Sequence, residues 1–209
     1  MSTTPVQIFR RQDGTKVDAV LHTEMKPSDL IDIEKEWAPH RMAAARKHAR
    51  VSGVAKIPQH YLWDWGRKSC KLRFLAYRCV GIECEGKCQG LLMVQLSGKV
   101  ARLDPDIGHE LVYIDYLESA PWNLAMMVDN PIFAGIGAVL MRSALQLSIE
   151  ENFHGRLGLH ALPQAETFYR DDWEMICCGI DPSYENLPYY EMNRDLAAKF
   201  ISSSDRRSV

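Results

Sequence analysis

The sequence lacks the patterns that mark several classes of protein. Its 209 residues carry a formal net charge of -2, so they show no basic excess of the kind that indicates nucleic acid or an anionic membrane as a partner. The best candidate for a membrane span is interrupted by Arg142. The first residues also lack the basic-then-apolar order of a signal peptide. We therefore expect a cytoplasmic protein with no membrane partner.

Patterns typical of metal sites are missing as well. The 6 cysteines include no Cys-x-x-Cys pair, and the 7 histidines show no ligand spacing. Cys177 and Cys178 are adjacent, so on a strand their side chains point to opposite faces and cannot chelate one ion together. We expect no metal site, and thiols that are free and mostly buried.

The chain shows neither an internal repeat nor a low-complexity linker. Its composition, 46% hydrophobic and 25% charged, is ordinary for a globular domain, and its length suffices for one large core. We predict a single domain over residues 1–201 and a disordered polar tail over residues 202–209.

The hydrophobic pattern predicts an α/β fold with a mixed sheet and helices on both of its faces. A helix is expected to begin near Pro27 with Ser28 as its cap, and Pro39 is expected to kink it or to start a second helix. A turn is expected at Asp13 and Gly14, and a hairpin at residues 85–87. The predicted strands lie within residues 6–20, 72–84, 89–103, 111–117, 156–161, 174–180 and 188–192.

The most informative segment is residues 130–137, which follow a strongly apolar stretch and open an amphipathic helix. Gly135 and Gly137 stand at Gly-x-Gly spacing, so the backbone can turn and present its N–H groups without side chains in the way. The positive end of the helix dipole lies behind them, and such a turn can bind a pyrophosphate. A purely structural turn fits the same residues, so the spacing alone leaves both interpretations open.

Three other segments also leave alternatives open. The basic segment 40–50, with Arg41 among its cations, can contact phosphate or form a solvated helix face. The aromatic segment 61–65 can fill the core or form one wall of a pocket, where Trp63 and Trp65 hold an ammonium group. The loop 122–131, with Met126 and Met127, can form a lid, a partner surface or a simple surface excursion.

Three local motifs carry a resemblance to a known family. Residues 132–137 are similar to a phosphate-binding pattern, Arg/Gln-x-x-Gly-x-Gly/Ala, and residues 155–161 to the strand that follows it. Ala165, Phe168 and Tyr169 match an Ala-x-x-Phe-Tyr motif on the next helix. In this order the motifs resemble the GNAT superfamily of N-acetyltransferases, clearly over residues 111–192 and only by element order before them. The resemblance implies a mixed, mostly antiparallel sheet.

The resemblance implies that acetyl-CoA is the co-substrate, with no metal. In the family the pyrophosphate rests on backbone N–H groups of the glycine turn, and the pantetheine arm pairs with the end of the preceding strand. That strand end corresponds here to Leu117 through Ser119. The turn corresponds to Phe133, Ala134, Gly135, Ile136, Gly137 and Ala138. Ile132 stands where the family has Arg or Gln, so one side-chain contact to phosphate is missing.

The resemblance also implies catalytic roles. Tyr169 stands where the family's tyrosine protonates the departing thiolate, although a packed aromatic residue fits the same position. A carboxylate near the end of the fourth strand is the expected base. Glu118 is our first candidate and Asp115 the second, and strand alternation puts them on opposite faces. Asp115 can instead be paired in the core, and Glu83 is a weaker third candidate.

The sequence thus favours an acetyl-CoA-dependent N-acetyltransferase that acts on an unidentified primary amine, of a small molecule or of a protein. Transfer would be direct, in a ternary complex, and the lack of a nucleophile signature at any Cys or Ser agrees with this. The alternative is a non-catalytic GNAT fold that binds acyl-CoA or a protein partner. A nucleic-acid role through the basic segment is a third hypothesis. The oligomeric state stays open, a homodimer included.

Overall fold

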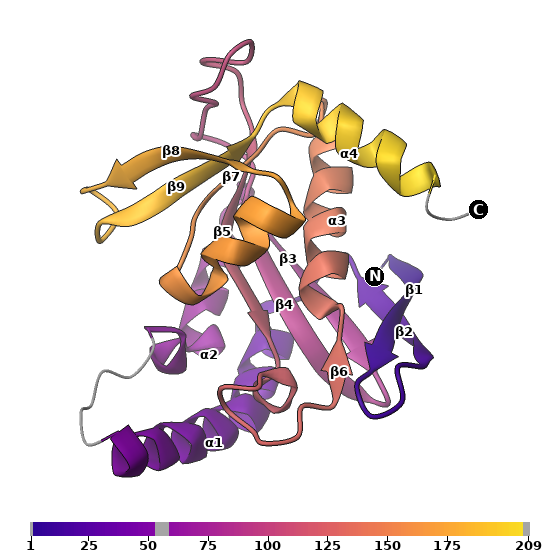
Figure 1. The fold of residues 1–209 in the computed structure, drawn as a ribbon, viewed down its shortest axis with the longest axis vertical. Helices are drawn as coiled ribbons and strands as arrows, with labels where there is room; N and C mark the ends of the chain where they lie inside the picture. Colours follow the sequence, from indigo (N-terminus) through magenta and orange to yellow (C-terminus); the bar gives the residue numbers. More distant parts are fainter. Residues whose placement is uncertain (1, 53–58, 207–209) are drawn as a thin grey trace. The chain divides into compact units, whose positions relative to one another are not determined.

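The computed structural model describes residues 2–52 and 59–206, and within them it shows a nine-stranded sheet with the order β6-β1-β2-β3-β4-β5-β7-β9-β8 (Figure 1). The strands are β1 Thr3–Arg10, β2 Lys16–His22, β3 Tyr77–Cys84, β4 Lys87–Gln95, β5 Val112–Ser119, β6 Phe133–Ala134, β7 Leu157–His160, β8 Ile176–Asp181 and β9 Leu187–Met192. The α-helices are α1 Pro27–Ser52, α2 Trp65–Lys68, α3 Ile136–Glu150 and α4 Arg194–Arg206. The shorter turns are η1 Gln59–Leu62, η2 Ser69–Arg73, η3 Pro121–Asn123, η4 Pro163–Ala165 and η5 Phe168–Asp172. None of the described helices is long and apolar enough to cross a membrane.

Contacts divide the chain into two compact units, each built from two segments. The first unit consists of Met1–Met93 and Tyr116–Met141, and the second of Val94–Asp115 and Arg142–Val209. The single domain expected over residues 1–201 stays a prediction.

The first unit contains the run β6-β1-β2-β3-β4-β5. Its β3–β4 hairpin turns at Glu85 and Gly86, which have φ values of 53° and 73°. Positive φ at both central residues is the requirement of a type I′ turn, whose twist matches that of the flanking strands. The hairpin expected at residues 85–87 is therefore present.

Helices cover both faces of this part of the sheet. On one face, Leu30 and Trp37 of α1 pack in a buried cluster with Leu91 and Met93 of β4. On the other face, a Cβ at Gly90 would lie 2.4 Å from Cγ2 of Ile136, at the start of α3. Only glycine at position 90 lets the first turn of α3 approach β4 this closely.

The second unit contains the run β5-β7-β9-β8. β5 and β7 are parallel over Val112–Ile114 and Leu157–Leu159, whereas β9 is antiparallel to both β7 and β8. Parallel and antiparallel pairs together confirm the mixed, mostly antiparallel sheet.

The buried carboxylate of Asp106 accepts a hydrogen bond from the backbone N–H of Arg194 at 2.9 Å and lies 3.4 Å from Arg156.

Several local predictions were wrong. α1 is one helix that continues through Pro39, and it begins at Pro27, so Ser28 is not its N-cap. The carboxylate of Asp29 instead accepts a hydrogen bond from the N–H of Lys26 at 2.8 Å. The expected helix with the Ala-x-x-Phe-Tyr motif is present over residues 163–172, but it begins as the 3₁₀ turn η4 and ends as the π-helical turn η5.

The expected disordered tail and the expected burial of the thiols also need correction. α4 extends to Arg206, so residues 202–206 are helical. Residues 207–209 lie outside the described residues. Cys79 and Cys84 are buried, but Cys70 and Cys177 are exposed.

Candidate active site

The glycine turn is held in place by a strand pair that joins distant parts of the first unit. β6 lies antiparallel to β1, with Phe9 opposite Ala134 and Arg10 opposite Phe133. The carbonyl of Ile132 accepts a hydrogen bond from the N–H of Arg11 at 2.9 Å. These contacts fix the backbone of residues 132–134, which directly precede the turn and α3.

A buried side-chain network fixes the same segment from the other side. The N–H of Phe133 donates to Oδ1 of Asn123 at 3.0 Å. Asn123 in turn donates to Oε1 of Gln89 at 2.9 Å, and the indole of Trp122 donates to the same oxygen at 2.8 Å. Gln89 and Asn123 are almost fully buried, so each of these hydrogen bonds satisfies a polar group that would otherwise be costly.

The turn itself leaves backbone donors without acceptors. Gly135 has a φ of 83°, in the left-handed region that favours glycine, and α3 begins directly after it. The first backbone hydrogen bond of the helix runs from Val139 to the carbonyl of Gly135 at 3.1 Å. The N–H groups of Ile136, Gly137 and Ala138 precede that bond, and among the described residues they have no acceptor. These donors, together with the dipole of a 15-residue helix, are groups of the kind that can bind an anion.

The structure reduces the expected set of contact residues. Because the N–H of Phe133 already donates to Asn123, it is not available to a phosphate. Ala134 belongs to the β1–β6 ladder. The donors left for a candidate anion site are therefore the N–H groups of residues 136–138.

Arg11 is a candidate binding residue that the sequence did not reveal. Its Nε donates to the carbonyl of Phe133 at 3.2 Å, so the guanidinium is anchored beside the turn, and the side chain is exposed. Its neighbour Arg10 is paired with Glu85 and lies over the ring of Phe133. Arg11 thus brings to the turn a cation that Ile132 does not supply. Only the pairing of β1 with β6, far apart in sequence, shows this.

Glu118 lies at the end of β5 in a buried cluster of charges. Its Oε2 accepts a hydrogen bond from the indole Nε1 of Trp65 at 2.5 Å, and its Oε1 lies 3.4 Å from Nη1 of Arg41. Arg41 also pairs with Glu34, whose other oxygen accepts from the backbone N–H of Trp65 at 2.9 Å. Arg41 is 2% exposed, so the solvated helix face expected over residues 40–50 is wrong at this position.

Burial sets the protonation of Glu118. Removal from water raises its pKa from the ordinary value of 4.5 to about 7, although Arg41 and the hydrogen bond from Trp65 act in the opposite direction. A carboxyl group with a pKa near neutrality can both accept and release a proton at physiological pH. Glu118 therefore has the protonation behaviour that a general base requires.

The aromatic segment 61–65 packs beside this carboxylate. Trp65 is fully buried, and Trp63 meets the ring of Tyr116 edge-on at 5.1 Å. The ammonium group of Lys68 lies 3.9 Å from the centre of the Tyr116 ring and 5.2 Å from that of Trp63. Trp65 is thus a core residue that binds Glu118. Lys68 of this chain occupies the cation–π position that was expected for the ammonium group of a substrate.

Within the first unit, the loop 122–131 packs against α1 and Tyr61. The hydroxyl of Tyr61 donates to the carbonyl of Met126 at 2.9 Å, and Met127 is buried in a cluster with Tyr61 and Ala44 of α1. Lys47 of α1 pairs with Asp129 at 2.7 Å. These contacts favour a loop attached to α1 over a simple surface excursion.

The other candidate bases lie in different surroundings. Asp115 belongs to the second unit and is partly buried. Leu117 and Ser119, the expected pantetheine partners, flank Glu118 and are partly buried. Glu83 is exposed and lies 3.1 Å from Nε2 of His22.

Tyr169 lies in the second unit, in the π-helical turn η5. It is 7% exposed and meets the ring of Phe168 edge-on at 5.2 Å. Its backbone carbonyl accepts a hydrogen bond from Met175 at 3.0 Å. Burial raises the pKa of its phenol above the ordinary value, so the hydroxyl keeps its proton at neutral pH.

Comparisons with known proteins identify the fold. No family model and no curated protein sequence matches the chain. The structure is similar to the GNAT domain of S. lividans PAT, with a TM-score of 0.52 and 11% identity over 91% of this chain and 96% of that one. It is also similar to the PaiA N-acetyltransferase of Thermoplasma acidophilum, solved with coenzyme A, with a TM-score of 0.51 and 11% identity over 84% and 98% of the two chains.

A third similar structure is the aminoglycoside acetyltransferase AAC(6')-Ib, solved with coenzyme A and kanamycin. Its TM-score is 0.51, with 15% identity over 87% of this chain and 98% of that one. Identities this low show a shared fold. The chain therefore has the GNAT fold, as the motifs predicted.

The raised pKa of Glu118 predicts a pH dependence of stability. Between about pH 4.5 and 7 the unfolded chain has ionised this carboxyl while the folded protein keeps it protonated, so stability falls as pH rises through that window and then levels off. Glu118→Gln cannot ionise. We expect the free energy of unfolding of the native protein, minus that of the variant, to fall by about 3 kcal/mol across the window, as measured by urea denaturation.

The comparison with the variant cancels the titration of every other group. A difference that rises with pH would contradict the interpretation, because it would mean that the ion pair with Arg41 outweighs burial and lowers the pKa of Glu118.

Proposed function

We propose that this protein, which has the GNAT fold, is an acetyl-CoA-dependent N-acetyltransferase that transfers an acetyl group directly to a primary amine. The observation that carries the proposal is the glycine turn, where the N–H groups of Ile136, Gly137 and Ala138 at the start of α3 find no acceptor within residues 2–52 and 59–206. Similar structures hold coenzyme A, and one of them also holds the aminoglycoside kanamycin, which supports an amine acceptor.

The turn would hold the pyrophosphate of acetyl-CoA. The backbone donors bind the phosphate oxygens, and Arg11, anchored on the carbonyl of Phe133, adds the side-chain cation. Gly135 and Gly137 keep the approach free of side chains. The pantetheine arm would pair with the backbone of Leu117 and Ser119.

Glu118 would act as the general base. An amine is a nucleophile only when it is neutral, so its ammonium proton must leave before nitrogen attacks the thioester carbonyl. Glu118 is buried and both its oxygens accept hydrogen bonds, so we propose that the proton reaches it through a water molecule. Arg41 and Trp65 position the carboxylate.

Tyr169 would act as the general acid. When the C–N bond forms and the C–S bond breaks, the CoA thiolate leaves and needs a proton. The phenol of Tyr169 is protonated at neutral pH because burial raises its pKa. Burial would also raise the pKa of the CoA thiol, so the departing thiolate would bind a proton more strongly.

The turn predicts the effect of a charge placed within it. Gly137→Glu puts a carboxylate among the phosphate donors, while an acidic residue in the first turn favours the helix itself. We expect acetyl-CoA at about 100 times its dissociation constant to raise the melting temperature of the native protein by about 5–10 °C. The variant should stay folded and show no increase.

Gly137→Ala is the control, which adds one methyl group and no charge, and it should keep most of the increase. Arg11→Gln removes one cation but no backbone donor, so it should weaken acetyl-CoA binding about tenfold. An unchanged increase in folded Gly137→Glu would refute the phosphate site.

The role of Glu118 predicts a pH-dependent loss of activity. Glu118→Gln should lower the rate of amine acetylation about 100-fold near pH 7 and less at high pH, where more of the amine is already neutral. The measurement is a pH–rate profile of CoA release. Asp115→Asn is the control and should keep its activity; a loss in that variant, with none in Glu118→Gln, would reverse the assignment.

The role of Tyr169 predicts a separation of turnover from affinity. Tyr169→Phe removes the proton donor but keeps the ring, so kcat should fall at least tenfold while the affinity for acetyl-CoA changes less than twofold. Tyr190→Phe, at another buried tyrosine of the second unit, should leave both unchanged. Full activity in Tyr169→Phe would remove the residue from the mechanism.

A further inference from the structure

The short segment that carries Trp65 has a second, outward surface. Residues 65–82 contain no acidic residue. They contain five cations, namely Arg67, Lys68, Lys71, Arg73 and Arg78. The net charge of the whole chain is -2, so this local concentration of positive charge is hidden in the overall composition.

Apolar side chains project beside these cations. Phe74 is 65% exposed and Leu75 is 99% exposed, directly after η2. The side chain of Arg67 is 91% exposed and Arg73 is also exposed. We name Arg67, Arg73, Phe74 and Leu75 the basic–apolar strip. Adjacent exposed apolar residues within a charged surface are typical of an interaction site.

The strip belongs to the segment whose Trp65 donates a hydrogen bond to the candidate base, Glu118. Trp65, at the start of α2, donates to the carboxylate of Glu118, and Lys68, one turn later, lies over Tyr116 of β5. Trp65 and Lys68 thus contact β5, whereas Arg67, Phe74 and Leu75 are exposed. Only a few residues of sequence separate the strip from Trp65.

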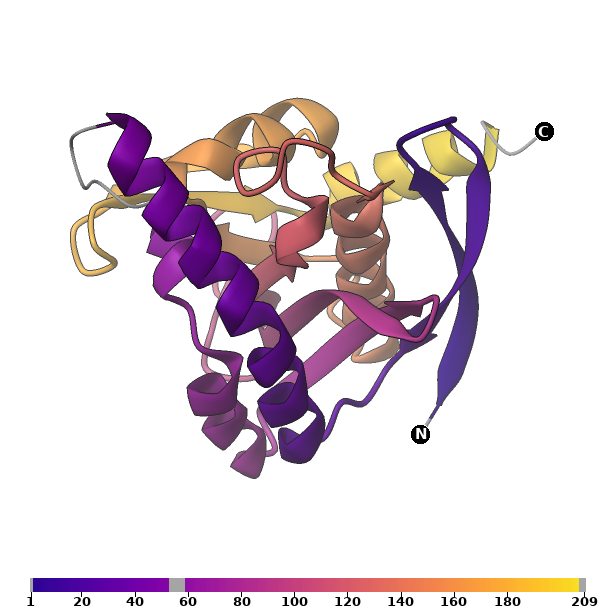
Figure 2. The same cartoon turned by 90° about the horizontal axis from the view of Figure 1, so that it is seen from below.

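The neighbouring helix restricts what can bind. α1 runs beside α2 and η2 in the first unit (Figure 2), and its first turns carry Asp29, Asp32 and Glu36. Glu24, just before α1, lies 3.8 Å from Arg78, and Asp64 lies 3.3 Å from Arg67. A broad anionic surface such as a bilayer would meet the carboxylates of Glu24 and Asp64 as well as the cations. A narrow acidic polypeptide along the strip would meet only Asp64, beside Arg67.

We propose that the acceptor is a polypeptide whose acidic and apolar residues dock on the basic–apolar strip and so present its amine to the site of Glu118. The proposal rests on the proposed function and narrows its substrate class. Acidic residues of the acceptor pair with Arg67 and Arg73, and its apolar side chains cover Phe74 and Leu75. Because the pairs are exposed, salt screens them.

Peptide binding without acetyl-CoA tests the docking step on its own. The probe is an octapeptide of alternating glutamate and leucine with a free amino terminus and a fluorophore at its carboxyl end, followed by fluorescence anisotropy at about 50 mM NaCl. The neutral counterpart has glutamine in place of glutamate. The native protein should bind the acidic peptide at least tenfold more tightly than the neutral one, and added salt should reduce the difference.

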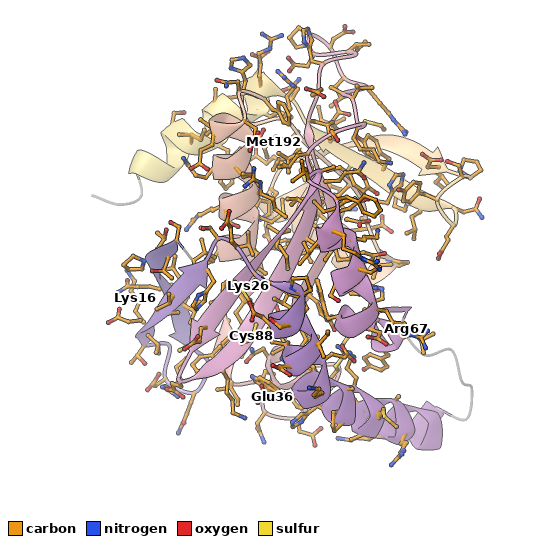
Figure 3. All side chains as sticks on the ribbon, turned by 180° about the vertical axis from the view of Figure 1, so that it is seen from behind. Lys16, Lys26, Glu36, Arg67, Cys88 and Met192 are labelled. Atoms are coloured by element: carbon orange, nitrogen blue, oxygen red, sulfur yellow. The ribbon has the colours of Figure 1, made fainter. Side chains whose placement is uncertain are left out.

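Two double variants remove the two properties of the strip. Arg67→Glu with Arg73→Glu, and Phe74→Ser with Leu75→Ser, should each weaken binding of the acidic peptide at least tenfold. The charge control is Lys16→Glu with Arg142→Glu; Figure 3 shows Lys16 on the β1–β2 hairpin and Arg67 on α2. The apolar control is Ile107→Ser with Ile180→Ser, both exposed. Both controls should bind within twofold of the native protein.

The readouts separate this proposal from the proposed function. Acetylation of the acidic peptide should show at least a tenfold higher kcat/KM than that of the neutral one, and the charge-reversed variant should lose the preference while keeping its affinity for acetyl-CoA. Peptide binding that ignores charge would overturn the docking proposal even if acetyl-CoA binds. Binding to phosphatidylserine vesicles without binding to the peptide would overturn it too. Failure of acetyl-CoA binding alone would instead refute the proposed function.

Discussion

The buried side chain of Gln89 is the point on which the candidate site depends. Its Nε2 donates to the carbonyl of Cys84 at 3.0 Å, and its Oε1 accepts from Trp122 and Asn123, while Asn123 accepts from the N–H of Phe133. One amide therefore ties the β3–β4 hairpin to the segment that starts the glycine turn. In a buried network every member must be satisfied, so the position of the turn is fixed by the core rather than by the loop before it.

The charged groups around Glu118 contribute to its chemistry more than to stability. A buried ion pair contributes little net stability, because desolvation offsets the attraction between the charges. Arg41 and Trp65 nevertheless hold this carboxylate at the end of β5, with a pKa of about 7. Groups whose pKa values are perturbed toward neutrality by burial are frequent at catalytic sites. A hydrophobic residue at this position would stabilise the fold equally well. We therefore favour a chemical role for Glu118.

The sequence predicted what depends on local signals. The β3–β4 hairpin, the glycine turn, α3 and the Ala-x-x-Phe-Tyr motif all lie in short stretches with their own pattern, and the GNAT fold was confirmed. It did not predict the β1–β6 ladder, because two residues of strand carry no pattern and their partner lies more than a hundred residues away. Long sequence separations, of 122 and 77 residues, also hid Arg11 at the turn and Arg41 beside Glu118. Pro39 misled the helix assignment, because the rest of α1 continues the helix despite one missing donor.

The central claim is that the backbone donors of residues 136–138 bind the pyrophosphate of acetyl-CoA. Calorimetric titration of the purified protein with acetyl-CoA, desulfo-CoA and ADP tests it most directly. We predict micromolar binding of acetyl-CoA and desulfo-CoA, with part of the affinity retained by ADP, because ADP keeps the pyrophosphate and lacks the pantetheine arm. Absence of binding for all three ligands would contradict the claim and leave the GNAT fold without its cofactor.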